Sequence, residues 1–125
     1  MTASDAPKSP LDMRSATSFA FSGATVRPFS GEQLTVCRVE FPGGAHLPAH
    51  SHVHEQIALI ESGRLRVWIA DGDPFEAGPG TLVHFPSEVT HSVEVLDDAV
   101  FFDIFTPVRE DFMKMLADDP DSGQS

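Results

Sequence analysis

The chain has 125 residues, of which 41% are hydrophobic, enough apolar material for the core of one domain but not of two. Nineteen acidic and eight basic residues give a formal net charge of −11, which opposes binding to nucleic acids and to anionic membrane surfaces. The single cysteine, Cys37, excludes an internal disulfide, and no apolar run reaches the roughly 20 residues needed to cross a bilayer.

The two ends of the chain lack the apolar periodicity of its middle. Residues 1–15 are rich in Ser, Ala, Pro and Asp and contain no signal-peptide pattern, so we expect a cytoplasmic protein. Residues 118–125 are acidic, small and interrupted by Pro120. The sequence therefore predicts a flexible lead-in at 1–15, a single folded domain at 16–117 and a flexible acidic tail at 118–125.

Between these ends, short strand-like segments alternate with breaks rich in Gly and Pro. The expected strands cover residues 19–21, 25–29, 33–41, 56–61, 64–70, 81–85, 92–96 and 100–105. The turns between them are expected at residues 42–44, 62–63, 71–72 and 78–80. Alternation along the third strand places Cys37 on the same face as Val39 and Phe41, which predicts a buried small hydrophobe rather than a nucleophile. Many short strands at close spacing are typical of a barrel or sandwich.

The last element has a helical pattern instead. Thr106 is a suitable N-cap, and Pro107 suits the first helical position. Two acidic residues follow, where they favour the positive end of a helix dipole. Apolar residues then recur at helical spacing, at Val108, Phe112, Met115 and Leu116. We expect a short C-terminal helix packed against the strands.

The segment 44–63 contains four histidines, a glutamine and two glutamates. His50 and His52 lie two residues apart, and side chains two apart on a strand share one face. Imidazole is a common ligand of divalent transition metals, and a useful site needs three or four donors at one point. Gln56 on the next expected strand and His91 after the second Gly- and Pro-rich segment could complete such a site.

Other polar residues near these positions have weaker patterns. Glu55 could be the ligand instead of Gln56, but its opposite strand parity disfavours it. His54 could contact a metal ligand or the substrate, or lie on the surface of a turn. His46 could reach a pocket mouth, although a structural role is favoured, and His84 is treated as structural.

These residues match two motifs of a known family. Gly44, His50, His52, Gln56 and Gly63 resemble the first motif of the cupins, and the second is matched by Gly80, Pro86 and His91. The resemblance implies an all-β, double-stranded β-helix jelly-roll barrel, here with a short C-terminal helix, and one divalent metal ion bound by His50, His52, Gln56 and His91. It departs from the family where Gln56 replaces the common Glu and where Val95 replaces the usual Asn.

The exchange of Glu for Gln56 has a chemical consequence. Three neutral imidazoles and an amide oxygen leave the full divalent charge on the ion, whereas a carboxylate would cancel half of it. A more electrophilic ion suits the polarisation of a carbonyl or enol oxygen, while dioxygen chemistry would be favoured more by a carboxylate ligand. The ligand types do not distinguish Zn, Ni, Fe and Mn.

The last expected strand carries a second set of polar side chains. Period two places Phe101, Asp103 and Phe105 on one face. A carboxylate between two aromatic residues is costly unless it faces a polar pocket, an ion or a basic partner such as Arg109. Asp103 could instead form a structural salt bridge or lie on the surface, and Arg109 could pair with one of the two acidic residues that follow it.

The strings HSHVHEQ and DIFTPVREDF resemble one group of small single-domain cupins. That group takes part in pectin and alginate breakdown and converts 4,5-unsaturated monouronates to the linear keto form. The resemblance implies an isomerase in which Asp103, Phe105 and Arg109 line the active site. Arg109 would bind the uronate carboxylate, Asp103 would act as general acid/base, Phe105 would shape the pocket, and the metal would stabilise the enolate-like charge.

Two other functions stay open at this point. The chain could be another small-substrate cupin enzyme, such as a dioxygenase, a lyase or an isomerase, or a non-catalytic metal-binding domain that senses a small molecule. Lyases of sulfonium compounds with this fold rely on a pocket tyrosine, and the chain contains no Tyr, which argues against that activity.

The expected partners are a small carboxylate-bearing sugar and, by analogy with cupins of this size, a second copy in a homodimer. One further group of residues could contribute to either contact. One face of an expected strand carries Arg64, Arg66 and Trp68. The sequence does not decide whether this face lines the pocket or lies on the outside.

Overall fold

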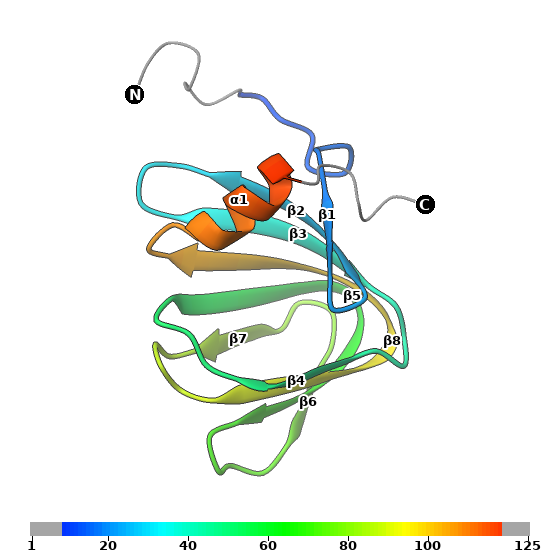
Figure 1. Ribbon diagram of the computed structural model, residues 1–125. Helices are drawn as coiled ribbons and strands as arrows, with labels where there is room; N and C mark the ends of the chain where they lie inside the picture. Colours follow the sequence, from blue (N-terminus) through cyan, green and yellow to red (C-terminus); the bar gives the residue numbers. More distant parts are fainter. Residues whose placement is uncertain (1–8, 119–125) are drawn as a thin grey trace.

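A computed structural model of the protein describes residues 9–118, which form one antiparallel β-barrel and a short helix (Figure 1). The elements are β1 (Phe19–Phe21), β2 (Ala24–Ser30), β3 (Thr35–Phe41), β4 (His46–His50), β5 (Glu55–Ile69), β6 (Phe75–Ala77), β7 (Leu82–Phe85), β8 (His91–Thr106) and α1 (Glu110–Asp118). The predicted all-β jelly-roll class with a C-terminal helix is confirmed.

The two longest strands, β5 and β8, run through both layers of the barrel. The first part of β5 pairs with β7 and with the last part of β8, which also pairs with β3. The register shifts between Ile60 and Leu65, after which β5 pairs with β6 and with the first part of β8. That part of β8 also pairs with β4. One layer thus contains β1, β2, β3 and β7, the other contains β4 and β6, and β5 and β8 join them.

Gly63 lies at the bend where β5 passes between the layers. Its φ is +82°, and a Cβ atom there would lie 2.2 Å from the carbonyl oxygen of Asp98, so glycine is required. The predicted turn at 62–63 is therefore wrong, because this glycine bends a continuous strand. The predicted strands 92–96 and 100–105 likewise belong to one strand, β8. Breaker residues mark both bends and turns, so the two could not be separated from the sequence.

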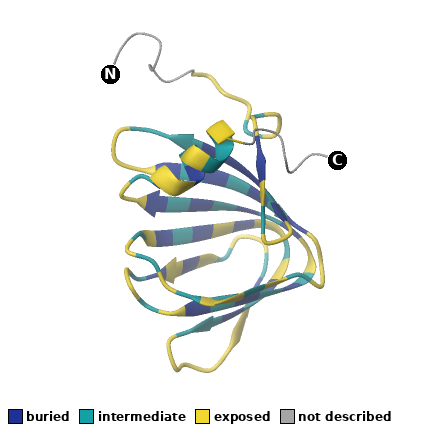
Figure 2. Cartoon of the chain, in the orientation of Figure 1, coloured by how far each residue is buried: buried dark blue, intermediate teal, exposed yellow. Residues whose placement is uncertain are grey.

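Inward and outward side chains alternate along the strands, as the buried and less buried stripes in Figure 2 show. The inward face of β3 contains Cys37, which is 0% exposed, together with Val39 and Phe41. Burial raises the pKa of the Cys37 thiol, which suppresses the reactive thiolate. The prediction that Cys37 is a buried small hydrophobe is confirmed.

The helix begins later than the sequence indicated. Thr106 is the last residue of β8 and is paired with Glu55, so it cannot cap α1 and Pro107 is not its first residue. The first intrahelical bond runs from the Met113 amide to the Arg109 carbonyl. The apolar pattern was nevertheless informative, because Phe112 packs against the core, with its ring centroid 5.3 Å from that of Phe19 in β1.

The predicted flexible ends fall largely on residues 1–8 and 119–125, which lie outside the described residues, and the domain limits stay predictions. Asp118, assigned above to the tail, is the last residue of α1. Within residues 9–118, no helix is both long and apolar enough to cross a membrane.

Candidate metal centre and adjoining cavity

Three histidines predicted as ligands lie together at one end of the barrel. His50 ends β4, His52 follows in the loop to β5, and His91 begins β8 opposite His50. One nitrogen of each ring can be chosen so that all three lie within 4.8 Å of one another. The prediction that His50 and His52 share a strand is wrong, because β4 ends at His50. The two rings still converge, with centroids 5.6 Å apart.

Backbone carbonyls orient all three imidazoles. Each Nδ1 lies near the carbonyl oxygen of a residue two positions away: His50 with Pro48 at 2.8 Å, His52 with His54 at 2.9 Å, and His91 with Val89 at 3.2 Å. A carbonyl oxygen only accepts, so each Nδ1 carries the proton and donates it. Each Nε2 is then left with a free lone pair, which is the arrangement that metal-binding histidines use.

Burial keeps two of these rings in the neutral form. Burial lowers the pKa of His91 to about 4, with the charges of His50 and His52 acting in the same direction. Burial also lowers the pKa of His52. Because a protonated imidazole cannot bind a cation, both shifts favour a ring that is ready to act as a ligand.

Gln56 lies beside the histidine cluster, near the start of β5. Its Oε1 lies 3.2 Å from Nε2 of His52. Because the His52 proton resides on Nδ1, both facing atoms carry lone pairs, and a cation between them would relieve their repulsion. The Gln56 side chain also hydrogen-bonds Asp103, which accepts from the amide nitrogen. The chemistry of these donors therefore fits a divalent metal ion.

Asp103 faces the same cavity from β8. It is 8% exposed, and its Oδ1 has no hydrogen-bond partner among residues 9–118. Burial raises the pKa of Asp103 to about 7, while the hydrogen bond from Gln56 and the positive charge of Arg109 act in the opposite direction. Oδ1 of this carboxyl group is thus available to a ligand.

Arg109 lies just before α1 and is almost completely buried. Its guanidinium carbon is 4.6 Å from the ring centroid of Phe105 and 3.7 Å from that of Phe112. Nε and Nη2 donate to the two carboxylate oxygens of Asp111 at 3.0 and 2.8 Å. Of the two acidic neighbours considered from the sequence, Asp111 is the one that pairs. The Arg109 amide donates to Oγ1 of Thr35 at 2.9 Å.

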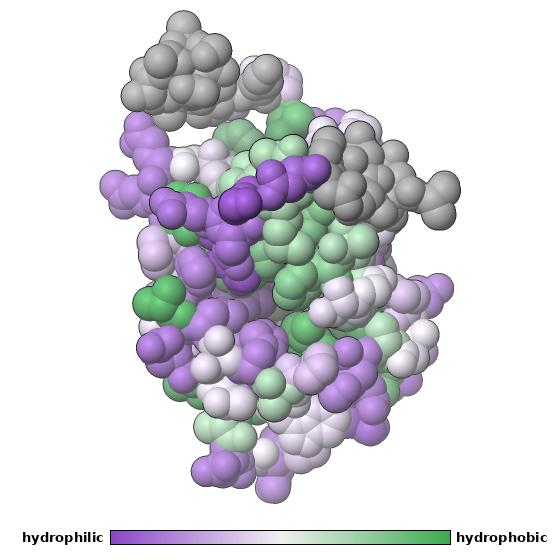
Figure 3. Space-filling view, viewed as in Figure 1, coloured by the Kyte–Doolittle hydropathy of each residue, from purple (hydrophilic) through white to green (hydrophobic). Residues whose placement is uncertain are grey.

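The six polar residues predicted to act at the site line one cavity of about 90 Å³: His50, His52, Gln56, His91, Asp103 and Arg109. Phe105, the seventh predicted residue, lines it as well, and much of the remaining wall is apolar. This volume exceeds the roughly 10–15 Å³ that a single water requires, so the cavity admits a small ligand or part of a larger one. On the face drawn in Figure 3, apolar residues gather beside the helix.

An open groove lies next to this cavity. It is lined by Glu32, Gln33, His54, Thr106, Pro107, Val108, Glu110 and Asp111. His54 thus lies beside the metal centre, with its ring centroid 5.7 Å from that of His52, but it does not line the cavity. Its backbone carbonyl also accepts a hydrogen bond from Nδ1 of His52.

The other candidates face away from the cavity. Oε2 of Glu55 lies 2.7 Å from Nε2 of His84, and both side chains are about half exposed, so Glu55 is not a fourth ligand. His46 is exposed on β4. The side chains of Arg64 and Arg66 form ion pairs on the outer surface, including those with Glu76, Asp97 and Glu94.

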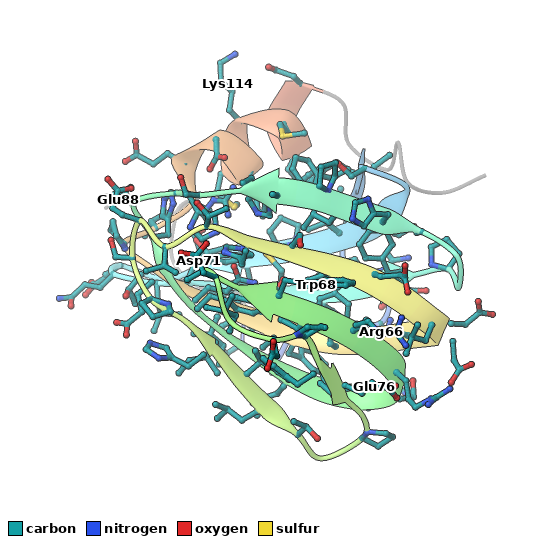
Figure 4. All side chains as sticks on the ribbon, turned by 90° about the horizontal axis from the view of Figure 1, so that it is seen from below. Arg66, Trp68, Asp71, Glu76, Glu88 and Lys114 are labelled. Carbon is teal, nitrogen blue, oxygen red and sulfur yellow. The ribbon has the colours of Figure 1, made fainter. Side chains whose placement is uncertain are left out.

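Arg66, Trp68 and Glu76 lie together on β5 and β6 when the barrel is viewed from below (Figure 4). The alternate residues Leu65 and Val67 are buried inside. The face that carries Arg64, Arg66 and Trp68 is therefore on the outside and does not line the cavity.

The sequence did not predict that Thr35 contacts Arg109. It is 0% exposed, and its Oγ1 lies 2.7 Å from Oγ of Ser30 as well as near the Arg109 amide. A hydroxyl on the inward face of β3, among apolar neighbours, was the signal that a buried polar partner had to exist.

Comparisons with known proteins agree with this architecture. Residues 37–105, more than half of the chain, match the family model described as Cupin domain. An RmlC-like cupin from Shewanella frigidimarina superposes with a TM-score of 0.77 at 22% identity, covering 85% of this chain and 96% of its own. KdgF from Halomonas sp. gives a TM-score of 0.72 at 24% identity, with coverages of 81% and 95%.

A third structure shows the same fold within a longer chain. A variant of oxalate decarboxylase from Bacillus subtilis has a TM-score of 0.69 at 24% identity, covering 78% of this chain and 29% of its own. No curated protein matches the sequence. At these identities the three structures establish the fold alone.

Proposed function

The chain belongs to the cupin family, and on that premise we propose that it is a metal-dependent enzyme that converts 4,5-unsaturated monouronates to the linear keto form. One observation carries the proposal. A histidine cluster with an adjacent amide lines the same small cavity as a partly unpaired buried carboxyl group and a buried guanidinium. Isomerisation of a carboxylate-bearing enol could use these three kinds of group together, to polarise an oxygen, to move a proton and to bind the carboxylate.

The metal ligands would be Nε2 of His50, His52 and His91 and Oε1 of Gln56. A bound divalent ion, whether Zn, Ni, Fe or Mn, would supply Lewis-acid polarisation of a substrate oxygen, and the uncharged ligand set leaves its full charge for this purpose. The backbone carbonyls that accept from the three Nδ1 atoms would hold the rings in place and increase their basicity.

Arg109 would bind the substrate carboxylate. Its guanidinium is planar, permanently charged and able to make two parallel hydrogen bonds to a carboxylate. The protein carries a formal charge of −11, so an anionic substrate must be attracted by local positive charge. Arg109 provides such charge on the cavity wall, and Phe105, which packs on the guanidinium, would also contact the sugar face.

Asp103 would move the proton. In the reaction, the anomeric hydroxyl at C1 loses a proton, the bond between C1 and the ring oxygen breaks, and that oxygen becomes the enolate oxygen on C5. A proton is then added at C4, which leaves a ketone at C5 and an aldehyde at C1, with no net oxidation or loss of atoms. The free Oδ1 of Asp103 is suited to take the proton and to return it.

The outer face of the larger layer supports the proposed homodimer. Leu59 of β5 is paired with Phe102 of β8 and Leu82 of β7, and the two leucines are 40% and 54% exposed. Ile57 and Ile104 lie in the adjacent row. Such a patch on a highly charged protein is suited to a second copy. If Leu82→Glu leaves the mass in solution unchanged, this face does not form the interface.

The function is tested with the metal-loaded protein and an unsaturated monouronate. We expect loss of the ultraviolet absorbance of the conjugated double bond and appearance of the keto product. Asp103→Asn should lower kcat by about 10²–10⁴-fold, the range of a general acid/base, with little change in KM. Glu61→Gln, a change at an exposed carboxylate outside the cavity, is the control. Full activity of the Asp103 variant would rule out the mechanism.

The same experiment separates catalysis from binding alone. A sensor domain would bind the sugar without consuming it, and chelation of the metal would abolish that binding. Absence of turnover by a protein that carries one metal ion per chain would therefore reject the enzymatic proposal.

A further inference from the structure

The guanidinium of Arg109 separates two hollows of the molecule. Arg109 lines the cavity that contains the histidine cluster, whereas its ion-pair partner Asp111 lines the open groove on the other side. Asp111 is not part of the cavity wall. The carboxylate that holds Arg109 and a ligand that enters the cavity would therefore approach the guanidinium from different directions.

The plane of the guanidinium is fixed by aromatic rings. The guanidinium carbon of Arg109 lies 3.7 Å from the ring centroid of Phe112 and 4.6 Å from that of Phe105. The Arg109 side chain is only 9% exposed. These contacts prevent the group from tilting, but a planar cation can still rotate in its own plane, so another contact has to fix which edge points into the cavity.

Asp111 supplies that contact. It accepts from Nε and Nη2, which together form one edge of the guanidinium. Nη1 has no acceptor in the described part of the chain, and Nη2 has a second hydrogen. The edge formed by Nη1 and Nη2 therefore remains able to bind another carboxylate through two parallel hydrogen bonds.

The backbone of Arg109 is anchored as well. Its amide donates to the buried hydroxyl of Thr35, which lies next to that of Ser30. Thr35 thus fixes the start of the side chain and Asp111 fixes its end. Little freedom is left for the guanidinium to swing away when a ligand binds.

We propose that Asp111 is a positioning residue, which holds the Nε and Nη2 edge of Arg109 so that the Nη1 edge faces the cavity for a ligand carboxylate. This inference rests on the proposed function in so far as Arg109 is the carboxylate partner. The opposite interpretation is that Asp111 occupies Arg109 and competes with the ligand. The two interpretations differ in sign, because removal of a positioning residue weakens binding and removal of a competitor strengthens it.

The test measures carboxylate binding without turnover. The full-length protein, loaded with Zn²⁺, is titrated calorimetrically with D-galacturonate, a saturated monouronate, with acetate, and with the neutral sugar D-galactose. We expect Asp111→Asn to weaken galacturonate binding about tenfold, in the range that loss of an orienting hydrogen-bond partner causes, and to leave galactose binding unchanged. Asp111→Glu, which retains a carboxylate, should recover part of the affinity.

Glu110→Gln is the matched control. It removes the same charge from the adjacent position of α1, where the Glu110 amide donates to the Val108 carbonyl and the carboxylate does not pair with the guanidinium that Asp111 holds. If Glu110→Gln weakens binding as much as Asp111→Asn, the effect is general electrostatics and the inference is wrong. Tighter binding of galacturonate by Asp111→Asn would establish competition and would also overturn it.

Failure of this inference can be distinguished from failure of the proposed function. If the wild-type protein binds galacturonate in an Asp111-dependent manner but does not consume unsaturated monouronates, the inference stands and the proposed reaction is rejected. If the wild-type protein consumes unsaturated monouronates and Asp111→Asn leaves both KM and carboxylate affinity unchanged, the proposed reaction stands and the inference is rejected. If neither acetate nor galacturonate binds to the metal-loaded wild type, Arg109 is no carboxylate site and the inference fails.

Discussion

The histidine cluster and Arg109 line the same cavity, but different kinds of contact orient them. Backbone carbonyls two residues away hold His50, His52 and His91. Arg109 is held by side chains, among them that of Thr35, 74 positions earlier in the chain. We call the part of the cavity that contains the three histidines the metal side, and the part that contains Arg109 the arginine side. Local backbone contacts orient the metal side, whereas tertiary packing orients the arginine side. Substitutions should therefore affect the two sides independently.

The largest effect is expected on the metal side. His91→Ala removes one of three imidazoles and leaves two imidazoles and an uncharged amide oxygen, a weak donor, so we expect metal content to fall from about one ion per chain to near zero. Mass spectrometry of the native protein and elemental analysis would measure this. His84→Ala, which changes an exposed histidine outside the cavity, should retain the metal. Full occupancy in the His91 variant would show that the cluster is not the metal site.

A smaller effect is expected on the arginine side. Thr35→Val keeps the volume of the side chain but leaves the buried Arg109 amide without its acceptor. We expect the free energy of unfolding to fall by about 1–3 kcal/mol in urea denaturation, with metal affinity unchanged. Thr35→Ser retains the hydroxyl and should lose about 1 kcal/mol or less, from one buried methyl group. Weaker metal binding by Thr35→Val would show that the two sides are coupled.

The ion pair of Asp111 should produce a small effect that depends on pH. The hydrogen bond and charge of Arg109 hold the pKa of Asp111 below its ordinary value of 3.8. The ion pair therefore stabilises the folded state above about pH 4, and this stabilisation is lost as the pH falls through the lower pKa that Asp111 has in the folded state. Because the Asp111 side chain is 56% exposed, we expect Asp111→Asn to cost only about 0–1 kcal/mol near pH 7.

Thermal unfolding of the wild type and this variant at several pH values would measure the difference. The two curves should converge as the pH falls well below 4. A gap that persists in acid would mean that Asp111 stabilises the protein through its packing and not through its charge.

The smallest effect is expected for Glu55, the ligand that the sequence left as an alternative. Its carboxylate lies 2.7 Å from Nε2 of His84 on the outer surface. Glu55→Gln should therefore leave both metal affinity and turnover unchanged within error. A marked loss of metal would mean that Glu55 turns inward when the ion binds. Glu55 would then replace Gln56 as the fourth ligand.

The metal side could be predicted from the sequence because its information is local. The spacing of His50, His52 and Gln56, with His91 in the second motif, predicted that these side chains lie together without knowledge of the strand boundaries. His52 was wrongly placed on a strand, but the prediction that its ring lies near that of His50 is still confirmed. The loop after β4 brings its ring to the same point as the strand would have done.

The arginine side could be predicted only in part. Period two correctly placed Asp103 and Phe105 on an inward face, but the role of Thr35 depends on how β3 and the residues before α1 meet in space. β4 and β6 are absent from the expected strands, although His50 was placed on a strand, because β4 contains Pro48 and β6 has the sequence FEA, whose apolar–polar alternation is too short to recognise. Propensity windows contain too little information for such elements.

The position of His50 has a consequence for how an ion would enter and leave. His50 ends β4, a strand of five residues that is mostly exposed, has an irregular register and, among residues 9–118, pairs with β8 alone. Such an edge opens at a lower free energy than the rest of a barrel. The kinetics of metal exchange would then follow the local opening of β4. By mass action, a bound ion would in return close that edge and slow its amide hydrogen exchange.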